Sequence, residues 1–578
     1  MCGIMGYIGD DEASQIIHNG LQRLEYRGYD SAGIATLSGN PGLQVTKDEG
    51  EIAEIHEEHG FHGMEGSIGI GHTRWATHGG VTKANAHPHT DCDERLALVH
   101  NGIIENHEEL ADELDGCTFE SETDTEVVAH YFEQKLDEGL GYEEAIESFM
   151  DDAEGTFAVV ILDREHEKLF AMKRKSPLAL GIGDGEFFLG SDLYAFSMHT
   201  DEAIFLEDGE YAIVSSSGYD IYERGGAAVQ REPETFEWEE EERGKQDYDH
   251  YMIKEIHEQP QAIRRLLKTL ETSQADELED MVQRIEDADK VIFTAAGTSY
   301  HAALLGVYLF QRAGIEAQAL IASEFQNYER VDDDTLVIAV SQSGETMDVL
   351  EAIDHSREKG GDIASIVNVP HSTIQRESSV SLEVHAGQEI CVAATKSFTN
   401  QVVTLMAVAE GLGLDIGLES VGDEIERVIE QNEGYVQELA AELEDADDMY
   451  VIGRGPTYPI SRELALKLKE IPYIHAEGMM GGELKHGTLA LIEEGTPVVS
   501  LIPEEDDAIL SNVEEVEARD ADSIRVSPFY GEFEMPEEPS KFALYSTTIG
   551  FLLAYYVAKR RDLPIDKPRN LAKSVTVK

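Results

Sequence analysis

The chain has 578 residues, 41% of them hydrophobic, which is long enough for roughly three or four domains with buried cores. Asp and Glu number 116 against 44 Lys and Arg, and the formal net charge of −72 argues against nucleic acid or an anionic membrane as a partner. The longest apolar run, near Ile549–Ala558, is too short to span a bilayer, and the start shows no basic, apolar leader. We therefore expect a cytoplasmic protein.

Such an acidic surface is tolerable where concentrated salt screens its self-repulsion, so we expect a halophilic protein. The four cysteines lack the spacing of a zinc ribbon or a disulfide framework: Cys2, Cys92, Cys117 and Cys391. His87 and His89 lack cysteines or paired carboxylates at ligand spacing, so we predict no metal and no cofactor. His72, His87 and His100 are expected to be hydrogen-bonded scaffold residues.

Residues 2–230 mix short apolar strands with a few helices, the pattern of a layered α+β domain. Helices are expected at Asp11–Leu24 and Thr123–Glu138, the second beginning with good capping residues. Strands are expected at Ile4–Ile8, Ser67–His72, Leu96–Val99, Thr156–Leu162 and Lys168–Met172.

Cys2 carries a thiol and, once Met1 is removed, a free α-amine on the same residue. The amine has a reference pKa of roughly 7.7–8.0, so near pH 7 a good fraction is neutral and can accept the thiol proton. A buried small residue on a first strand is the alternative, and Cys2 by itself favours that alternative.

Three later segments favour the nucleophile. Arg74, followed by Trp75 in HTRWATHG, can grip a carboxylate with two parallel hydrogen bonds. Asn101 and Gly102 in HNGIIENH offer an amide side chain and a backbone N–H for an oxyanion hole. Asp124 in SETDTE can hold an ammonium group. Together with a thiol, these groups predict hydrolysis of free glutamine.

These segments, with YRGYDSAG (Tyr26–Gly33) and NAHPH (Asn85–His89), resemble the N-terminal-nucleophile, or class II, glutamine amidotransferases over residues 2–225. The resemblance implies that Cys2 is both nucleophile and base, that Asn101 and Gly102 form the oxyanion hole, and that Trp75 lies near the exit for ammonia. The glutamine-binding residues that it implies are Arg74, Trp75, Thr77, His78 and Asp124.

A charged, aperiodic segment predicts an acidic linker at 231–250. Beyond it, short β-branched strands alternate with long helices, which is typical of a parallel sheet with crossover helices. Strands are expected at Lys290–Thr294, Leu336–Val340, Ile363–Asn368 and Ser379–Val384.

An internal repeat predicts two tandem α/β domains of one fold. VIFTAAGTSYHAA (Val291–Ala303) is similar to YVIGRGPTYPIS (Tyr450–Ser461), with a strand, a glycine turn and a helix in each. The segments that follow are expected to correspond as well: ASEF (Ala322–Phe325) with HAEG (His475–Gly478), and IAVSQSGET (Ile338–Thr346) with VVSLIPEED (Val498–Asp506).

SQSGET (Ser341–Thr346) joins an apolar strand to a helix that is expected to begin at Met347. Hydroxyls, a glycine and a helix N-terminus at the carboxyl end of a strand predict an anion site. An N-capped helix with Ser341 or Ser343 as the cap is the alternative. AGTSY (Ala296–Tyr300) supplies a second such turn, which can line the same crevice.

The second half resembles the sugar isomerase domain, a doubly wound α/β fold, and we expect copies at 251–435 and 436–566 and a tail at 567–578 that contributes to the sugar site. A class II glutaminase with two such copies resembles the family of glutamine-dependent aminotransferases that convert fructose 6-phosphate to glucosamine 6-phosphate, the first step of amino sugar synthesis. The segments that carry this likeness are HYMIKEIHEQP, VAATKSFTNQ, ALKLKEIPYIHAEG, GELKHGTLAL and PRNLAKSVTVK.

The family resemblance implies glutamine and fructose 6-phosphate as substrates, a homodimer, and an internal channel that passes ammonia to the isomerase site. It implies that Lys573 forms a Schiff base, that Glu470 moves the C1–C2 proton, and that Lys467 assists at the O1 hydroxyl. His486 would open the sugar ring from the neighbouring subunit. The implied contacts to the phosphosugar are Thr298, Ser299, Ser341, Gln342, Ser343, Thr346 and Val392.

Without the resemblance, Lys573 would be a solvated charge, and Lys467 with Glu470 an ordinary surface pair on one helix face. Two features depart from the family: Ala394 stands where serine is common, which puts one hydroxyl to the sugar in doubt, and the loop Glu477–Glu483 differs from commoner forms.

Three other functions are alternatives to this one. Another amidotransferase would need a phosphoribosyl or ATP-pyrophosphate motif, and a phosphosugar-sensing module would be expected to lack Cys2, Glu470 or Lys573. A paralogue acting on a different phosphosugar, or cleaving an amino sugar, stays open.

Overall fold

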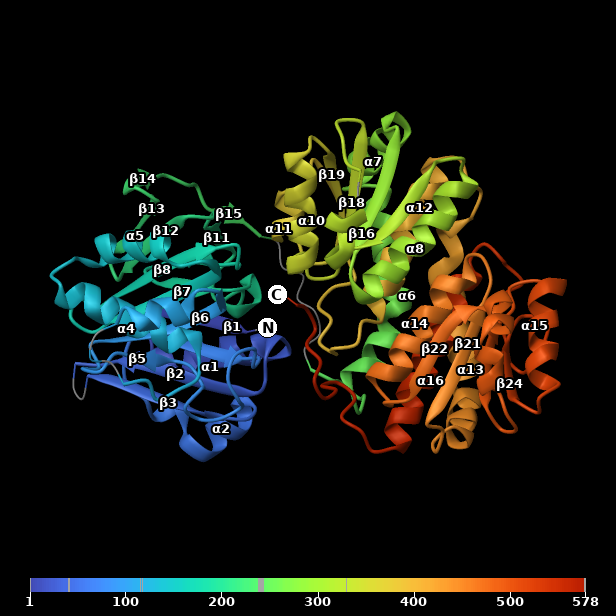
Figure 1. Cartoon of the computed structure of the whole chain (residues 1–578), viewed down its shortest axis with the longest axis horizontal. Coiled ribbons are helices and arrows are strands. Elements are labelled where there is room, and N and C mark those ends of the chain that lie inside the picture. Colours follow the sequence, from blue (N-terminus) through green and yellow to red (C-terminus); the bar gives the residue numbers. More distant parts are fainter. Residues whose placement is uncertain are drawn as a thin grey trace. The chain divides into compact units, whose positions relative to one another are not determined.

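The computed structural model describes residues 2–39, 42–114, 116, 118–236, 244–328 and 330–575. Cys117, part of the predicted linker and the last three residues of the predicted tail lie outside these ranges. The chain divides into two compact units, Met1–Glu240 with Ser574–Lys578, and Glu241–Lys573 (Figure 1). Each unit is described by itself.

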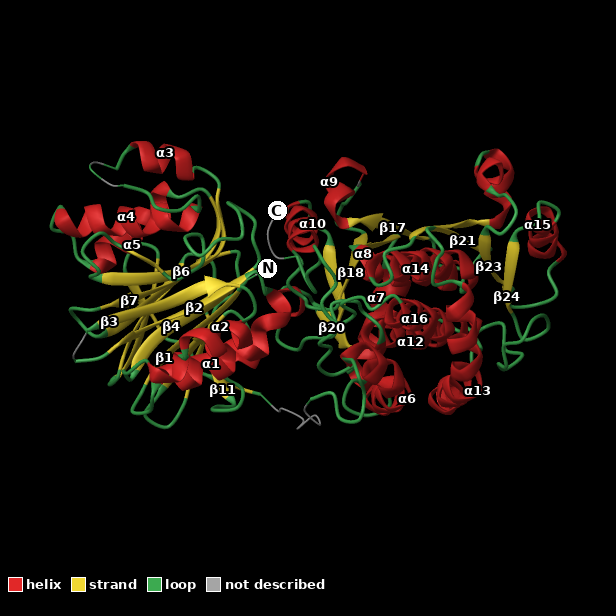
Figure 2. Ribbon diagram, turned by 90° about the horizontal axis from the view of Figure 1, so that it is seen from below, coloured by secondary structure: helices red, strands yellow, loops and turns green. Residues whose placement is uncertain are grey.

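The first unit contains two antiparallel sheets between layers of helices (Figure 2). The eight-stranded sheet has the order β15-β11-β9-β10-β1-β4-β2-β3, and the seven-stranded sheet β14-β13-β12-β8-β7-β6-β5. The strands are β1 Gly3–Ile8, β2 Ser31–Leu37, β3 Leu43–Glu49, β4 Ile68–Arg74, β5 His89–Thr90, β6 Leu96–Ile104, β7 Gly155–Asp163, β8 Lys168–Arg174, β9 Ala179–Ile182, β10 Phe187–Gly190, β11 Glu202–Phe205, β12 Glu210–Ser215, β13 Gly218–Glu223, β14 Ala227–Val229 and β15 Glu234–Thr235. The helices are α1 Ala13–Leu24, α2 Ile52–His59, α3 His107–Asp112, α4 Asp124–Asp137 and α5 Tyr142–Asp152.

Side chains that alternate along β1 explain this layering. Ile4 and Ile8 belong to the core between the two sheets, whereas Met5 and Tyr7 belong to the core that also holds the apolar face of α1. β1 is a central strand between β10 and β4, and its first residue, Gly3, pairs with Thr73. The residue just before β1 is Cys2, so the sheet fixes the predicted nucleophile beside the end of β4.

The second unit has two parallel sheets, a five-stranded one of order β17-β16-β18-β19-β20 and a four-stranded one of order β22-β21-β23-β24. Helices α12, α14 and α16 lie between the two sheets (Figure 2). The strands are β16 Lys290–Ala295, β17 Ala317–Ile321, β18 Thr335–Ser341, β19 Asp362–Val367, β20 Val380–Glu383, β21 Asp448–Gly453, β22 His475–Met480, β23 Pro497–Leu501 and β24 Asp522–Val526. The helices are α6 Tyr251–Leu270, α7 Ala275–Asp287, α8 Gly297–Arg312, α9 Phe325–Tyr328, α10 Met347–Glu358, α11 Thr373–Arg376, α12 Lys396–Gly411, α13 Val421–Glu442, α14 Thr457–Glu470, α15 Asp507–Glu517 and α16 Phe542–Arg560.

The strand order shows the internal repeat. β16 lies between β17 and β18, and β21 lies between β22 and β23, so the turns before α8 and α14 are equivalent. The predicted match of ASEF with HAEG is wrong, because ASEF follows β17 whereas HAEG begins β22. The predicted alignment depended on two similar residues, and it placed the segment of the second copy one strand too early. The expected boundary at 435/436 falls inside α13.

The apolar run Ile549–Ala558 lies inside α16, where most of its side chains are buried in the core of the second unit. Among the described residues, no helix has both the length and the apolar character that a membrane span requires.

Candidate active sites

Cys2 meets the backbone of the strand-to-loop passage after β4. The N–H of Trp75 donates to Cys2 Sγ at 3.3 Å, and the Sγ lies 3.6 Å from the Trp75 carbonyl oxygen. Burial raises the pKa of the Cys2 thiol above its ordinary value. The thiol therefore needs a base to form the reactive thiolate.

Asn101 lies beside Cys2, with its amide orientation fixed by a histidine. Asn101 Nδ2 donates to the Cys2 carbonyl oxygen at 3.0 Å, and its Oδ1 lies 3.0 Å from His72 Nε2. That Nε2 is also 3.0 Å from the His100 carbonyl oxygen, so the imidazole carries its proton there and donates to both oxygens. Burial lowers the pKa of His72 to about 3, which keeps the ring neutral. His72 is thus a scaffold residue, as predicted.

The backbone after Asn101 requires glycine. Gly102 has φ +134°, and a Cβ there would lie 2.0 Å from the carbonyl oxygen of Thr156 on β7. Asp124, the first residue of α4, accepts from the Ile104 N–H at 2.9 Å, which joins the end of β6 to that helix. Strand β6 therefore brings Asn101 and Gly102 to Cys2, and its last residue, Ile104, contacts Asp124.

The loop after Trp75 is held by two side chains. Arg74 is buried and donates to the carbonyl oxygens of His78 and Gly80, the latter at 3.2 Å. Asp30 Oδ2 accepts from the Ala76 N–H at 2.8 Å. Asp30 belongs to the segment YRGYDSAG, and no role was predicted for it from the sequence.

The Trp75 ring packs edge-on against Tyr29 at 5.5 Å. Of the other predicted glutamine-binding residues, Thr77 is exposed and the His78 ring packs against His107 at 5.1 Å.

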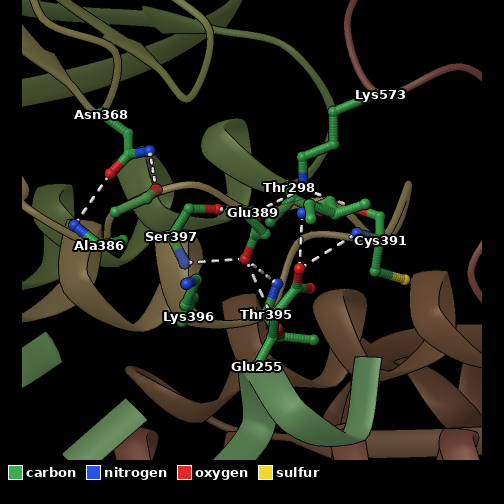
Figure 3. Close-up of polar contacts among 12 residues, drawn as sticks. Glu255, Thr298, Asn368, Ala386, Glu389, Cys391, Thr395, Lys396, Ser397 and Lys573 are labelled. Atoms are coloured by element: carbon green, nitrogen blue, oxygen red, sulfur yellow. Dashed lines mark hydrogen bonds and ion pairs between the residues drawn. The ribbon is translucent and has the colours of Figure 1, made fainter. Parts of the chain in front are cut away.

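In the second unit, Lys573 lies in a buried polar group (Figure 3). Its Nζ forms an ion pair with Glu389 and donates to the Cys391 carbonyl oxygen at 2.8 Å; the lysine and glutamate side chains are 1% and 0% exposed. Glu389 also accepts from the N–H groups of Thr395 at 2.9 Å and Ser397 at 3.0 Å. Burial opposes ionisation, but Lys573 and these hydrogen bonds outweigh it and lower the pKa of Glu389 to about 2. Lys573 is therefore no solvated charge.

Glu255, on α6, reaches the same group from the other side (Figure 3). Its Oε1 accepts from the N–H groups of Ile390 at 2.5 Å and Cys391 at 3.2 Å. Its Oε2 is buried and finds no hydrogen-bond partner among the described residues. Burial and the neighbouring Glu389 raise the pKa of Glu255 to about 8, so its carboxyl group is protonated near neutral pH. Sequence reasoning missed Glu255 and Glu389, although both lie in or beside segments that carry the family likeness.

A second polar group lies where α14 packs against α8. Lys467 Nζ is 2.5 Å from Glu470 Oε2, 3.4 Å from Glu463 Oε1 and 3.1 Å from Thr298 Oγ1. Glu463 also accepts from Thr298 Oγ1 at 3.1 Å and pairs with His301 at 2.7 Å. Burial disfavours the lysine cation, but the two carboxylates outweigh it and raise the pKa of Lys467.

The pair of Lys467 and Glu470 is thus partly buried and is no surface pair: Lys467 is 1% exposed and Glu470 20%. Sequence reasoning missed Glu463. It stands four residues before Lys467, the spacing that places both on one helix face, and this was the signal available.

The hydroxyl groups of the SQSGET turn form hydrogen bonds within the turn itself. Ser341 Oγ accepts from the Gly344 N–H at 3.0 Å and lies 3.2 Å from Thr346 Oγ1, and Ser343 Oγ accepts from the Glu345 N–H at 3.2 Å. The N-cap residue of α10 is Thr346, so the alternative with Ser341 or Ser343 as the cap is wrong. The helix begins at Met347, as predicted.

Four further predicted site residues make other contacts or none that bear on the prediction. Ser299 Oγ accepts from Gln401 Nε2 at 3.0 Å, and the Val392 N–H donates to the Asp566 carbonyl oxygen at 3.0 Å. The Gln342 carbonyl oxygen accepts from the N–H of Asn368 at 3.3 Å. His486 is exposed at the end of the 3₁₀ helix Gly481–His486.

Comparisons with known proteins agree with this architecture. Residues 72–198 match the glutamine amidotransferase domain, and residues 284–411 and 442–528 match the SIS domain. A glutamine–fructose-6-phosphate aminotransferase (isomerizing) of Thermococcus kodakarensis is 45% identical over 608 aligned residues, which cover 100% of both chains. One of Pyrococcus horikoshii is 42% identical over 604, again covering 100% of both. These matches confirm the predicted order of a glutaminase followed by sugar isomerase domains.

Among solved structures, the C-terminal domain of glucosamine-fructose-6-phosphate aminotransferase from Francisella tularensis is 32% identical and covers 57% of this chain and 100% of its own, with a TM-score of 0.49.

Proposed function

The chain belongs to the glutamine–fructose-6-phosphate aminotransferase family, and on that premise we propose that it converts glutamine and fructose 6-phosphate to glutamate and glucosamine 6-phosphate. The observation that carries this proposal is the buried amine of Lys573, held by Glu389 and the Cys391 carbonyl oxygen. Lysine is ordinarily solvated, and an amine held in a buried site beside a carboxylate is suited to attack on a carbonyl group.

Glutamine hydrolysis begins at Cys2. After removal of Met1, the α-amine of Cys2 accepts the thiol proton, and the thiolate attacks the side-chain amide carbon of glutamine. The tetrahedral oxyanion is stabilised by Asn101 Nδ2 and the Gly102 N–H. The α-amine gives its proton to the amide nitrogen, which leaves as ammonia as the thioester forms, and water then hydrolyses the thioester to glutamate and restores the thiol.

The reaction of the sugar begins with the open-chain form of fructose 6-phosphate. We propose that the phosphate binds at the SQSGET turn, where the N-terminus of α10 favours an anion. His486 would help to open the ring. The Lys573 amine, once it has lost a proton to water, would attack the C2 carbonyl and form a Schiff base with loss of water. Ammonia would then displace Lys573, which leaves an imine at C2 of the sugar.

The isomerisation moves a proton between adjacent carbons. Glu470 would remove the proton from C1 of the C2 imine and deliver it to C2, while the O1 hydroxyl loses a proton and the imine nitrogen gains one, which gives the C1 aldehyde and the C2 amine. Lys467 lies 2.5 Å from Glu470 and would stabilise charge that develops at O1. Overall, the water consumed in releasing ammonia is regained when ammonia enters the sugar.

We further propose that ammonia passes to the sugar through an internal channel, with Trp75 as a gate. Ammonia that reaches water near neutral pH is mostly ammonium, which is no nucleophile, so an enclosed path would preserve the nitrogen. We also propose a homodimer in which His486 serves the neighbouring subunit's sugar site, and a cytoplasmic location.

One incubation tests the proposed function. The purified chain in concentrated KCl receives glutamine labelled with ¹⁵N in its side-chain amide, together with fructose 6-phosphate, and the products are identified by mass. We expect ¹⁵N in glucosamine 6-phosphate and an equal amount of glutamate. Cys2→Ala should lose this labelled product but still aminate fructose 6-phosphate with added ammonium salt. Glutamate release without any amino sugar in the unaltered chain would overturn the proposal.

A further inference from the structure

Three histidines of the first unit gather at one point, although 44 positions separate the first from the last in the chain. They are His18 on α1, His56 on α2 and His62 on the 3₁₀ helix Phe61–Gly63. One ring nitrogen of each lies within 4.8 Å of one ring nitrogen of each of the other two. His18 Nδ1 and His62 Nε2 are 3.1 Å apart, and the centroid of the His56 ring is 4.4 Å from that of His18 and 4.3 Å from that of His62.

The cluster has one internal hydrogen bond, between His18 Nδ1 and His62 Nε2, and His62 is exposed. His72 donates to a carbonyl oxygen and an amide oxygen, whereas His18 Nε2 and His56 Nδ1 are buried with no hydrogen-bond partner among the described residues. A neutral imidazole is the form that binds a metal ion.

We propose that His18, His56 and His62 together bind a divalent transition-metal ion of the zinc class. Zinc binds imidazole nitrogen at about 2.0–2.1 Å, so ligand atoms of a tetrahedral site lie roughly 3.4 Å apart. The 3.1 Å between His18 Nδ1 and His62 Nε2 is close to that separation. Three histidines leave the fourth position for water, and imidazole suits Zn²⁺ better than Mg²⁺ or Ca²⁺.

The surroundings favour a cation. Helix α2 carries Glu54, Glu57 and Glu58 besides His56, and the whole chain has a formal net charge of −72. A negative surface of this kind raises the local concentration of divalent cations.

A metal ion there would fasten α2 and the 3₁₀ turn to α1. Helix α1 ends at Leu24, and a Cβ placed on Gly3 would lie 2.7 Å from Leu24 Cβ, so α1 supports the backbone next to Cys2. The ion is therefore a structural clamp on the helix behind the nucleophile, and it takes no part in either reaction. This inference does not depend on the proposed function.

The test uses the untagged full-length chain, stripped with a chelator and dialysed. It is titrated with ZnCl₂, and bound zinc is counted by mass spectrometry while the melting temperature is recorded. We expect bound zinc and a higher melting temperature. His62→Gln should lose one equivalent of zinc per chain and most of the thermal shift. His59→Gln is the matched control, because His59 also lies on α2 but pairs with Asp48 at 2.8 Å.

A second group, Cys92 with His130 and Glu133, could also take up zinc, and cobalt distinguishes the two. Co²⁺ bound by three imidazoles gives visible bands without a thiolate charge-transfer band, whereas Co²⁺ on Cys92 shows that band. Three results would each overturn the proposal: no zinc bound, the same zinc content in His62→Gln as in the unaltered chain, or a cobalt spectrum that Cys92→Ser abolishes entirely. Circular dichroism of His62→Gln establishes that the variant is folded.

Discussion

Lys573 and Glu389 form an ion pair whose side chains are 1% and 0% exposed, although 184 positions separate them in the chain. Removal of one partner from such a pair leaves an uncompensated charge in the interior, which is strongly destabilising. The chain thus fastens its C-terminal segment to the loop before α12 through the same amine that we assign to the Schiff base.

Two variants of Lys573 separate these roles. Lys573→Arg keeps a cation beside Glu389 but cannot form a Schiff base, so we expect a near-normal melting temperature, normal glutaminase activity and no amino sugar. Lys573→Ala should also destabilise the second unit, by about 3–5 kcal/mol. Borohydride reduction with fructose 6-phosphate should attach the sugar to the unaltered chain only. Sugar trapped equally on Lys573→Arg would rule out this lysine.

Glu470→Gln should abolish the isomerisation and spare glutamine hydrolysis. Loss of a positioned general base typically lowers the rate about 10²–10⁴-fold. Separate assays of glutamate and amino sugar measure how strongly the substitution affects each of the two reactions. Lys469→Gln is the control, since Lys469 is the exposed neighbour on α14. Equal activity of the two variants would contradict the role of Glu470.

Trp75→Ala should keep glutamine hydrolysis but lose much of its coupling to amino sugar formation. The backbone N–H of residue 75 still donates to Cys2 Sγ in this variant, so only the ring is removed. The measured quantity is the ratio of amino sugar to glutamate. A ratio that stays at one would show that the ring is no gate.

Glu255→Gln should change how stability depends on pH. The folded-state pKa of Glu255, about 8, lies above its ordinary value, so folding is favoured at low pH and this contribution is lost as pH rises through 8. The amide introduced by the substitution would keep the Oε1 acceptor without titrating. Between pH 5 and 9, the unfolding free energy of the unaltered chain should fall relative to that of the variant, by on the order of 3 kcal/mol. The unfolding free energies come from denaturant titrations at each pH. If those of the unaltered chain and the variant change with pH in parallel, a buried, protonated Glu255 is excluded.

Low salt should destabilise the chain. A formal net charge of −72 repels itself, and the Debye length grows from about 3 Å at 1 M salt to about 10 Å at 0.1 M. The melting temperature should therefore rise with KCl concentration. A melting temperature that is flat or falling from 0.1 to 3 M KCl would contradict the expected halophilic character.

Local patterns predicted much of the fold, because they depend on neighbours in the chain. The strand β1, the start of α10 at Met347 and the strands β16, β18, β19 and β20 were predicted from local sequence, whereas β17 was missed. The match of ASEF with HAEG failed because two letters cannot fix a register that strand pairing decides.

The candidate sites were harder, because burial depends on distant segments. Glu255, Glu389 and Lys573 come from three separate parts of the chain, and only the folded core brings their charges together. Likewise, no spacing rule connects His18 with His56 and His62, since the paired strands β2 and β3 separate α1 from α2 in the chain.

The contact between Thr298 and Lys467 joins the first helix of one repeat to the first helix of the other. One repeat supplies the hydroxyl of Thr298 and the other the residues to which we assign proton transfer, Lys467 and Glu470, so a lone repeat would hold only part of the proposed site. Two identical single-repeat chains would present the same part twice. Because both copies belong to one polypeptide, their sequences can diverge, and each copy can contribute groups that the other lacks.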